Sequence, residues 1–361
     1  MGLSNSIGRS IGRSIGRSIA SASTAPPTPP DPYGTDFVMV MRTTGASETV
    51  TIPCQNVGTF NATIDWGDGQ TSDITAYNDA DLSHVYATAG DHTIRISGTF
   101  PNIYFNNTGH KAKLIKVLQL GDVGWVTLEK AFYGCFAGGS GAEYEFTAGP
   151  CNTSSVNTMQ HMMREWSSMT ASPDLTGLDT SSVNTMRHMM SGWTSMMVPP
   201  DLTGLDTSSV TSMSAMMLGW TSMTASPDLT GLDTSSVTDM SFMMRNWFSM
   251  TSPPDLTGFD TSSVTSMAVM MSGWSSMTIG DIGVASFNLG LVTNLTGFAE
   301  GSAFTTEAYD AILTAWNAQD PVNGLSVHFG SSQYTSGGAA EAARASLISS
   351  DSWTITDGGA A

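Results

Sequence analysis

The sequence predicts a multidomain α+β protein with an N-terminal antiparallel β-sandwich, an α/β solenoid of 27-residue repeats and a C-terminal α/β cap. Three observations predict this fold class. Between residues 37 and 105, apolar and polar residues alternate in short runs separated by turn residues. Five units then repeat with a period of 27 residues. Two helical patterns and two strand patterns follow the last repeat.

The charge of the chain limits its partners. The chain has 361 residues, which is enough for two or three domains. Acidic residues outnumber Lys and Arg by 31 to 13, giving a formal charge of −18. A net anion repels phosphate, so we expect no nucleic-acid partner. No apolar run reaches about 18 residues, so the sequence predicts no membrane span.

Residues 1–30 form a basic, low-complexity leader that ends in a Pro-rich linker. The segment repeats SIGR and carries three Arg and no acid, which leaves −21 on residues 31–361 (−18 minus 3). One interpretation is a flexible leader, and the other is a docking peptide that folds against a larger assembly. The docking residues would be Ile7, Arg9, Ile11, Arg13, Ile15 and Arg17. MGLSNS also matches an N-myristoylation pattern. Arg interrupts every apolar stretch, so we predict no signal peptide.

Residues 31–108 are predicted to form the β-sandwich, because alternating strands and frequent turns are typical of that architecture. WGDGQ at residues 66–70 is followed by HVYATAGDHTIRIS at residues 84–97. These two motifs resemble the signature of the polycystic kidney disease (PKD) domain. Asp68 is either a cation ligand or a local cap of its Gly-flanked turn, and we favour the cap.

Residues 109–290 are predicted to form the solenoid. Each unit begins with an Asp-Thr-Ser-Ser cluster typical of a helix N-cap, and Val, Met, Met and Met follow at i, i+3, i+6 and i+7. This spacing predicts a short helix of about three turns in every unit. No unit can bury its apolar stripe alone, so each must stack on the next. The Val column is Val156, Val183, Val210, Val237 and Val264, and the Trp column is Trp166, Trp193, Trp220, Trp247 and Trp274.

The Trp column has two interpretations. Between columns of Met it favours the core, whereas on the surface it would form an aromatic stripe for sugar stacking. The chain has 24 Met, which we also assign to the core. His161 and His188 share one column that holds Ala, Phe and Val in other units, so we interpret them as a tolerated packing position rather than metal ligands.

Residues 291–361 are predicted to form a capping segment that covers the apolar edge of the last repeat. TTEAYDAILTAW predicts an amphipathic helix, LSVHF a strand, SGGAAEAARASLIS an Ala-rich helix and SWTIT a final strand.

Two Asp columns run along the repeats, and the first is a weak candidate for a row of calcium ligands. Its members are Asp174, Asp201, Asp228 and Asp255. The second column, from Asp179 to Asp260, lies where an N-cap belongs. Both columns therefore have a local structural role, and we predict no cofactor.

The remaining side chains predict no catalytic site. Identical rows of Ser, Thr and Asp do not supply the unlike, convergent groups that catalysis needs, so we predict a protein that is not an enzyme. Cys54, Cys135 and Cys151 are interpreted as buried thiols, with a bridge between Cys135 and Cys151 as the alternative.

The repeat TSSVTDMSFMM, with its Trp, Leu and Phe-Asp, resembles the BspA-type leucine-rich repeat of bacterial surface proteins. The resemblance covers about residues 109–300, with Trp in place of that family's usual small or Cys residue. The C-terminal segment is similar to the tail that follows such repeats in bacterial surface proteins and phage virion proteins. A PKD-like domain, these repeats and this tail behind a basic leader look most like a phage tail or fibre protein.

This resemblance implies a non-catalytic protein on the virion surface, oligomeric within the assembly, that docks to other virion proteins through residues 1–30. The repeats would then bind a glycan or protein receptor on the host surface. A bacterial cell-surface adhesin, located extracellularly or on the cell surface, is one alternative. A capsid decoration protein without receptor binding is the other.

Overall fold

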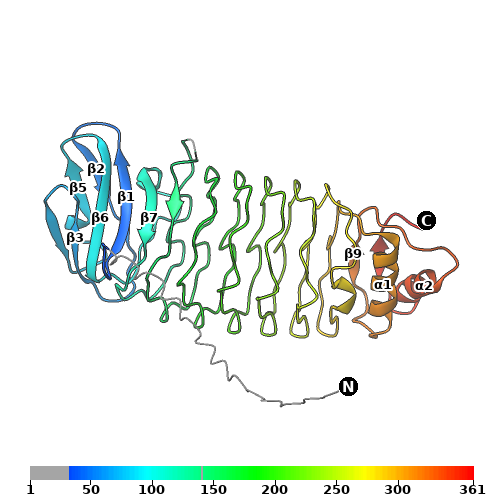
Figure 1. The fold of residues 1–361 in the computed structure, drawn as a ribbon. Coiled ribbons are helices and arrows are strands. Elements are labelled where there is room, and N and C mark those ends of the chain that lie inside the picture. The colour runs from blue at the N-terminus through cyan, green and yellow to red at the C-terminus, as the bar shows by residue number, and fades with distance from the viewer. Residues whose placement is uncertain (1–31, 140) are drawn as a thin grey trace, which may run out of the picture. The chain divides into compact units, whose positions relative to one another are not determined.

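The computed structural model describes residues 32–139 and 141–361. The residues predicted to dock, from Ile7 to Arg17, lie outside the described part of the chain. Thr35–Ala361 form one compact unit, and the fold below is the fold of this unit. Figure 1 shows a sheet at its N-terminal end, a row of similar coils, and helices at its C-terminal end.

An open sheet of six strands begins the unit, in the order β4-β3-β6-β1-β7-β8. Its strands are β1 (Phe37–Thr43), β3 (Asn61–Asp65), β4 (Thr71–Ile74), β6 (Gly90–Thr99), β7 (Leu114–Gln119) and β8 (Glu145–Phe146). The β1 strand is apolar and almost fully buried because it pairs antiparallel with β6 on one side and with β7 on the other. β2 (Glu48–Thr51) and β5 (Ser83–Tyr86) form a separate antiparallel pair.

The six-stranded sheet extends past the predicted domain boundary at residue 108. β7 pairs antiparallel with β1, and β8 pairs parallel with β7, so the sheet itself joins the N-terminal strands to the repeats. A single cluster of buried apolar side chains likewise includes residues from Phe37 to Trp353. The division into four segments stays a prediction.

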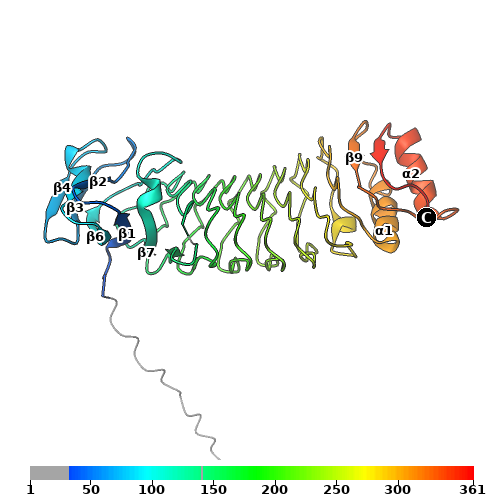
Figure 2. The same ribbon diagram turned by 90° about the horizontal axis from the view of Figure 1, so that it is seen from above.

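The repeats form coils without any helix. Coil 1 to coil 5 begin at residues 152, 179, 206, 233 and 260, and they consist of turns, bends and isolated bridge positions. Parallel bridges join Thr158, Thr185, Ser212, Asp239, Ser266 and Asn294 in succession. Figure 2 shows these coils following one another between β7 and α1.

Backbone hydrogen bonds between coils replace those of the predicted helices. In coil 2, Met186 N donates to Ser212 O (3.1 Å) and His188 N to Ser214 O (3.0 Å), both in coil 3. Met190 N likewise donates to Met216 O of coil 3 (3.0 Å), whereas Met189 N, between these donors, bonds Met186 O (3.0 Å) and closes a turn. An α-helix needs every N–H for the carbonyl four residues earlier. Sending alternate N–H groups to the next coil is therefore incompatible with a helix.

Residues with a left-handed backbone conformation allow the N–H groups to alternate between the same coil and the next one. In coil 2, His188 has φ 55° and Gly192 has φ 83°. The same two positions have positive φ in the other coils, with Glu165 and Asn246 in place of Gly in coils 1 and 4. A positive φ breaks the right-handed helical path and turns the chain, and Gly and Asn tolerate it best.

Stacked side chains fill the interior of the coils. The five repeat Trp side chains are completely buried, and neighbouring rings stack at centroid distances of 5.7, 5.5, 5.7 and 5.4 Å, tilted by less than 10°. Each indole N–H also has an acceptor; Trp220 Nε1, for example, donates to Met190 O (2.7 Å). The prediction that the Trp and Met columns are core is confirmed.

A column of buried Thr side chains also joins neighbouring coils through hydrogen bonds. Thr207 Oγ1 donates to Asp233 O in the next coil (2.8 Å), and the equivalent Thr180 and Thr234 make the same bond. These hydroxyl groups satisfy carbonyl groups away from solvent, where an unpaired acceptor is costly.

The C-terminal segment contains the four elements predicted from its pattern. They are α1 (Thr306–Asn317), β9 (Ser326–His328), α2 (Ala339–Ser349) and β10 (Thr354–Thr356). Thr305 caps α1 by accepting from Ala308 N, and the helix buries Tyr309, Ile312 and Trp316. Trp316 Nε1 donates to Val284 O (3.1 Å), in the short 3-10 helix Val284–Ser286 that follows the last repeat. Two further 3-10 turns are Ala80–Leu82 and Lys111–Lys113.

The predicted fold class is wrong. The described residues are mostly β and turn structure with two α-helices, both C-terminal to the repeats, so the α/β solenoid of helical units does not form. The N-terminal strands likewise belong to an open sheet that continues into the repeats, and not to a self-contained sandwich. The apolar stripe of each unit is buried as expected, but by turns and bonds between coils.

We expect Trp220→Ala to destabilise the protein by about 3–5 kcal/mol, because it removes a buried ring from the middle of the Trp stack. Urea unfolding followed by fluorescence and circular dichroism measures this change. Met197→Ala is the control, since Met197 is 58% exposed, and it should change the free energy of unfolding by less than about 0.5 kcal/mol. Equal effects of the two substitutions would contradict the stacked interior.

Two Thr residues of coil 3 allow a buried and an exposed hydrogen bond between coils to be compared. Thr207 is buried, whereas Thr211 is exposed and donates to Asn184 O (3.0 Å). Thr207→Val should cost about 1–3 kcal/mol because it removes a hydrogen bond made by a buried hydroxyl, and Thr211→Val less than about 0.5 kcal/mol because water replaces the exposed hydroxyl. Thermal unfolding of both variants checks the difference, and a larger loss for Thr211→Val would refute it.

Candidate functional site

The buried columns leave only the outer rows of the coils for contact with a ligand. Because all five repeat Trp side chains are inaccessible, the alternative of an exposed Trp stripe for sugars is wrong. The outward-facing features are two rows of Asp, a hollow between two coils, and a column of His.

The first Asp row lies on exposed turns, one per coil. Asp201 Oδ1 accepts from Thr203 N (3.0 Å) and from Thr203 Oγ1 (2.7 Å), and Asp228 bonds Thr230 in the same way. Asp174 and Asp255 accept from the backbone N–H two residues ahead. No partner of the outer oxygen Oδ2 of these four side chains is found within the described ranges. Each turn therefore presents one free acceptor to solvent.

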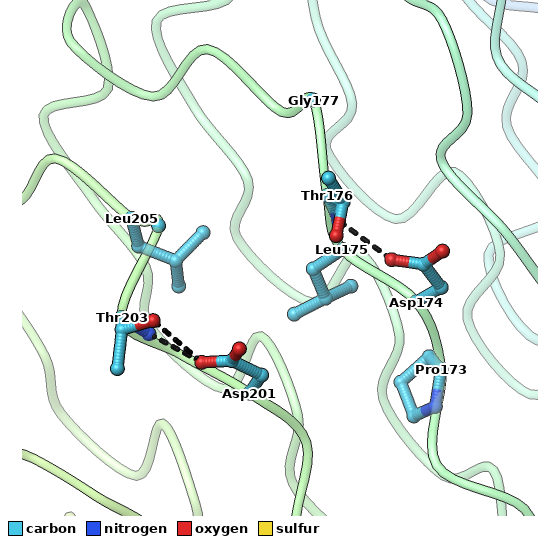
Figure 3. A pocket seen from close by; sticks show the side chains of 9 residues that line it. Pro173, Asp174, Leu175, Thr176, Gly177, Asp201, Thr203 and Leu205 are labelled. Atoms are coloured by element: carbon cyan, nitrogen blue, oxygen red, sulfur yellow. Dashed lines mark hydrogen bonds between the residues drawn. The ribbon is translucent and has the colours of Figure 1, made fainter. Parts of the chain in front are cut away.

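A hollow of about 290 Å³ separates the first two turns of this row. Residues 173–177 of coil 1 and residues 201 and 203–205 of coil 2 line it, so Asp174 and Asp201 stand on neighbouring walls. Figure 3 shows both carboxylates hydrogen-bonded to their own Thr, with Leu175 and Leu205 beside them. A hollow that combines carboxylate acceptors with Leu and Pro surface can take a small polar ligand with an apolar side.

The geometry of this row does not favour calcium, although its carboxylates are charged. Hydrogen bonds from Thr203 and Thr230 lower the pKa of Asp201 and Asp228, so both are ionised at neutral pH. A calcium ion takes six to eight oxygen ligands, which usually converge from one loop. Among residues 32–139 and 141–361, no three His, Cys, Asp or Glu side chains are grouped to hold a metal ion. The four Asp residues instead accept hydrogen bonds within their own turns.

The second Asp row has a role in the fold. Asp206 Oδ1 accepts from Ser208 N (3.0 Å) and Ser208 Oγ (2.6 Å), and Asp179 and Asp233 repeat this geometry. Asn152 at the start of coil 1 and Asn288 after coil 5 replace Asp at this position and accept through their amide oxygens. The cluster expected to cap a helix therefore closes a turn.

Two exposed apolar side chains precede one wall of the hollow in the sequence and were not singled out from the sequence. Met197 is 58% exposed and Val198 is 62% exposed, just before the Pro-Pro-Asp that leads to the wall of the hollow. The equivalent positions of coil 3 are Thr224 and Ala225. The sequence could have indicated them, because coil 2 has Met and Val where the next coil has Thr and Ala.

The column that contains His161 and His188 is partly exposed. The two imidazole rings stack at 4.9 Å, and Tyr133 extends the stack on the other side of His161 at 5.8 Å. Burial, together with nearby cationic groups, lowers the pKa of both His residues to about 4. Both are therefore neutral at pH 7. Phe242 occupies the same column with the same left-handed backbone, which fits the interpretation of a tolerated packing position.

The His pair should make the protein sensitive to mild acid. The unfolded chain takes up protons near pH 6.5 and the folded His residues only near pH 4, so this contribution is present above pH 6.5 and is lost as the pH falls toward 4. We expect His188→Phe to reduce the loss of stability between pH 7 and pH 5 by about 1 kcal/mol, after allowance for partial exposure.

Urea unfolding at several pH values measures this effect. Phe is a suitable replacement because Phe242 already occupies this position in coil 4 with φ 61°. A wild-type protein as stable at pH 5 as at pH 7 would contradict the lowered pKa values.

The remaining predicted sites are placed as follows. Asp68 caps its turn by accepting from Gln70 N (3.1 Å) and also pairs with His84 Nε2 (2.8 Å). The three Cys residues are free, so Cys135 and Cys151 are not bridged. Cys135 is fully buried, whereas Cys54 and Cys151 are partly exposed. Within the described ranges, no helix has the length and apolar character needed to cross a bilayer.

Comparison with protein families finds one match. The model described as "Mycoplasma protein of unknown function, DUF285" matches residues 128–246 and again residues 222–335. Together these matches cover residues 128–335, more than half of the 361-residue chain. The chain therefore belongs to this family. Comparison with curated proteins and with solved structures gave no match.

Proposed function

We propose that this protein is a non-catalytic component of a virion surface, of the phage tail or fibre class, that binds a receptor on the host surface through its coils. Residues 1–30 dock it to other virion proteins, and the resemblance of the repeats, the PKD-like motifs and the C-terminal segment to surface and virion proteins supports this setting. A bacterial adhesin and a capsid decoration protein are the alternatives.

One observation carries the receptor-binding proposal. Consecutive coils present the same exposed Asp turn at Asp174, Asp201, Asp228 and Asp255 on a stack with a completely buried interior. A single shallow contact binds weakly, but several contacts at a fixed spacing combine into strong adhesion because each later contact is intramolecular. A rigid row of equivalent turns supplies such contacts, especially when several copies of the chain are held in one assembly.

The charge distribution supports a separate role for the leader. Residues 1–30 carry +3, whereas residues 31–361 carry −21 (−18 minus 3), so the two parts suit different partners. Thr35–Ala361 form a compact unit without the leader. The docking function and the binding function can therefore be separated by truncation.

Deleting residues 1–30 should leave a folded protein that still binds bacterial cells but is no longer incorporated into virus particles. Circular dichroism checks folding, fluorescence of the labelled protein on a panel of bacterial strains measures binding, and immunoblotting of purified particles measures incorporation. Incorporation of the truncated chain at the level of the full chain would remove the proposed anchor. If the truncated chain is not incorporated into particles and binds no strain, the alternative of a capsid decoration protein is favoured.

A further inference from the structure

Most cationic side chains of the described residues are neutralised by an adjacent carboxylate. Arg42, Arg95 and Arg344, for example, form ion pairs of 2.5 to 2.7 Å with Asp or Glu. Arg187 is an exception: it is exposed, and no ion pair or side-chain hydrogen bond of its guanidinium occurs among residues 32–139 and 141–361. An unpaired cation on a chain with 31 acidic residues marks a position where an anion is favoured.

A second Arg lies next to the same His column. The Arg164 guanidinium lies over the Tyr133 ring at 5.0 Å, and Arg164 Nη1 lies 3.4 Å from His161 Nδ1. Its Nη2 pairs with Glu165 at 3.3 Å, a long ion-pair distance. The Nε of Arg164 is buried and has no hydrogen-bond partner among the described residues. Arg245 Nε is buried and unpaired in the same way, so this atom does not mark a ligand site, and a surface ligand would be bound by the terminal nitrogens of Arg164.

These groups form one surface, which we call the His–Arg face: Tyr133, His161, Arg164, Arg187 and His188. The backbone brings Arg187 beside His161, since His161 N donates to Arg187 O (3.0 Å), and Arg164 and Arg187 both contribute to the low pKa of the two imidazoles. Lys130 also acts on His161, and Glu165 accepts from Tyr133 Oη (3.2 Å). The face therefore combines two guanidinium groups with the edges of three stacked rings, and because Glu165 offsets the charge of Arg164, its uncompensated positive charge is that of Arg187.

The chemistry of the face fits an acidic sugar unit. Guanidinium groups bind carboxylate and phosphate through charge-assisted hydrogen bonds, while neutral imidazole and phenol edges can bond hydroxyl groups. A long polyanion such as nucleic acid would also be repelled by the net negative charge of residues 31–361. A compact ligand with one anionic group avoids that repulsion.

We propose that the His–Arg face binds the anionic group of an acidic saccharide, with Arg187 and Arg164 on its carboxylate or phosphate and His161 and His188 beside its hydroxyl groups. The site rests on the proposed function, because it supplies the contact for an anionic group of the receptor, whereas the Asp turns can contact only its uncharged or cationic groups. It is distinct from the hollow at Asp174 and Asp201, whose carboxylates repel an anion.

Binding of defined saccharides by the chain of residues 31–361 tests the proposal. The probes are sialyllactose with lactose as its neutral counterpart, digalacturonic acid, glycerol phosphate, and a short single-stranded DNA, each measured by calorimetry at low salt. We expect one or more acidic saccharides to bind at least about tenfold more tightly than lactose, since a charge-assisted hydrogen bond is worth that much. The carboxylate and phosphate probes identify which anion is preferred.

The variants assign binding to the face. Arg187→Gln should weaken the preferred acidic probe about tenfold and leave lactose unchanged, and its exposed position makes the substitution harmless to the fold. Arg164→Gln should weaken it similarly. Arg245→Gln is the matched control: Arg245 lies over Phe242 at 5.7 Å in the same columns, but without a neighbouring His or a second Arg. It should change affinity less than about twofold.

Several results would overturn the proposal. These are equal binding of acidic and neutral sugars, no binding of any acidic probe, tighter binding of DNA than of any saccharide, or an Arg187→Gln variant that binds as wild type. Binding of the labelled protein to bacterial cells shows whether only the saccharide site is wrong or the proposed receptor-binding function as well. If Arg187→Gln still binds cells as wild type does, the face is not the receptor site although adhesion stands. If Arg187 governs saccharide binding but no cells are bound, the site stands and adhesion fails.

Discussion

Alternate backbone N–H groups of each coil donate to carbonyl groups of the next coil, and the remaining features of the repeats depend on this arrangement. It fixes the distance between coils, and that distance sets the stacking of the Trp rings at 5.4 to 5.7 Å. It also brings Thr207 Oγ1 within bonding distance of Asp233 O and places each indole N–H against a carbonyl of the preceding coil. Side chains and backbone thus satisfy their hydrogen bonds through the same contact between neighbours.

Much of the interior was predictable from the sequence, but its backbone was not. The 27-residue period identifies the Val, Met and Trp columns, and burial follows from periodicity whatever the local conformation. Spacings of three and four suit both a helix and a series of tight turns, so the pattern alone could not choose between them. The deciding residues have positive φ at His188 and Phe242, where the residue type gives no warning. Gly192 and Gly219 indicated a left-handed turn, but Glu165 and Asn246 occupy the same position in other coils, so the repeat has no constant Gly there.

On the outer surface, too, some features could be predicted from the sequence and others could not. Asp201 and Asp206 were correctly expected to have local hydrogen-bonding roles, because Asp beside Thr or Ser commonly closes a turn. The His–Arg face could not be foreseen, since it depends on which side chains of successive coils become neighbours. His161, Arg164 and Arg187 are ordinary departures from the repeat when viewed in one dimension. They become one surface only when the coils are placed in register.

The uniform contact between coils has an evolutionary consequence. Each coil presents to its successor the same bonds and the same flat indole that it receives from its predecessor, so removing one coil would bring together two surfaces that already match. In-frame duplication or loss of 27 codons is therefore tolerated structurally, and it would lengthen or shorten the protein by one step. Recombination within such a gene can change the reach of the molecule while the chemistry of its ends stays the same.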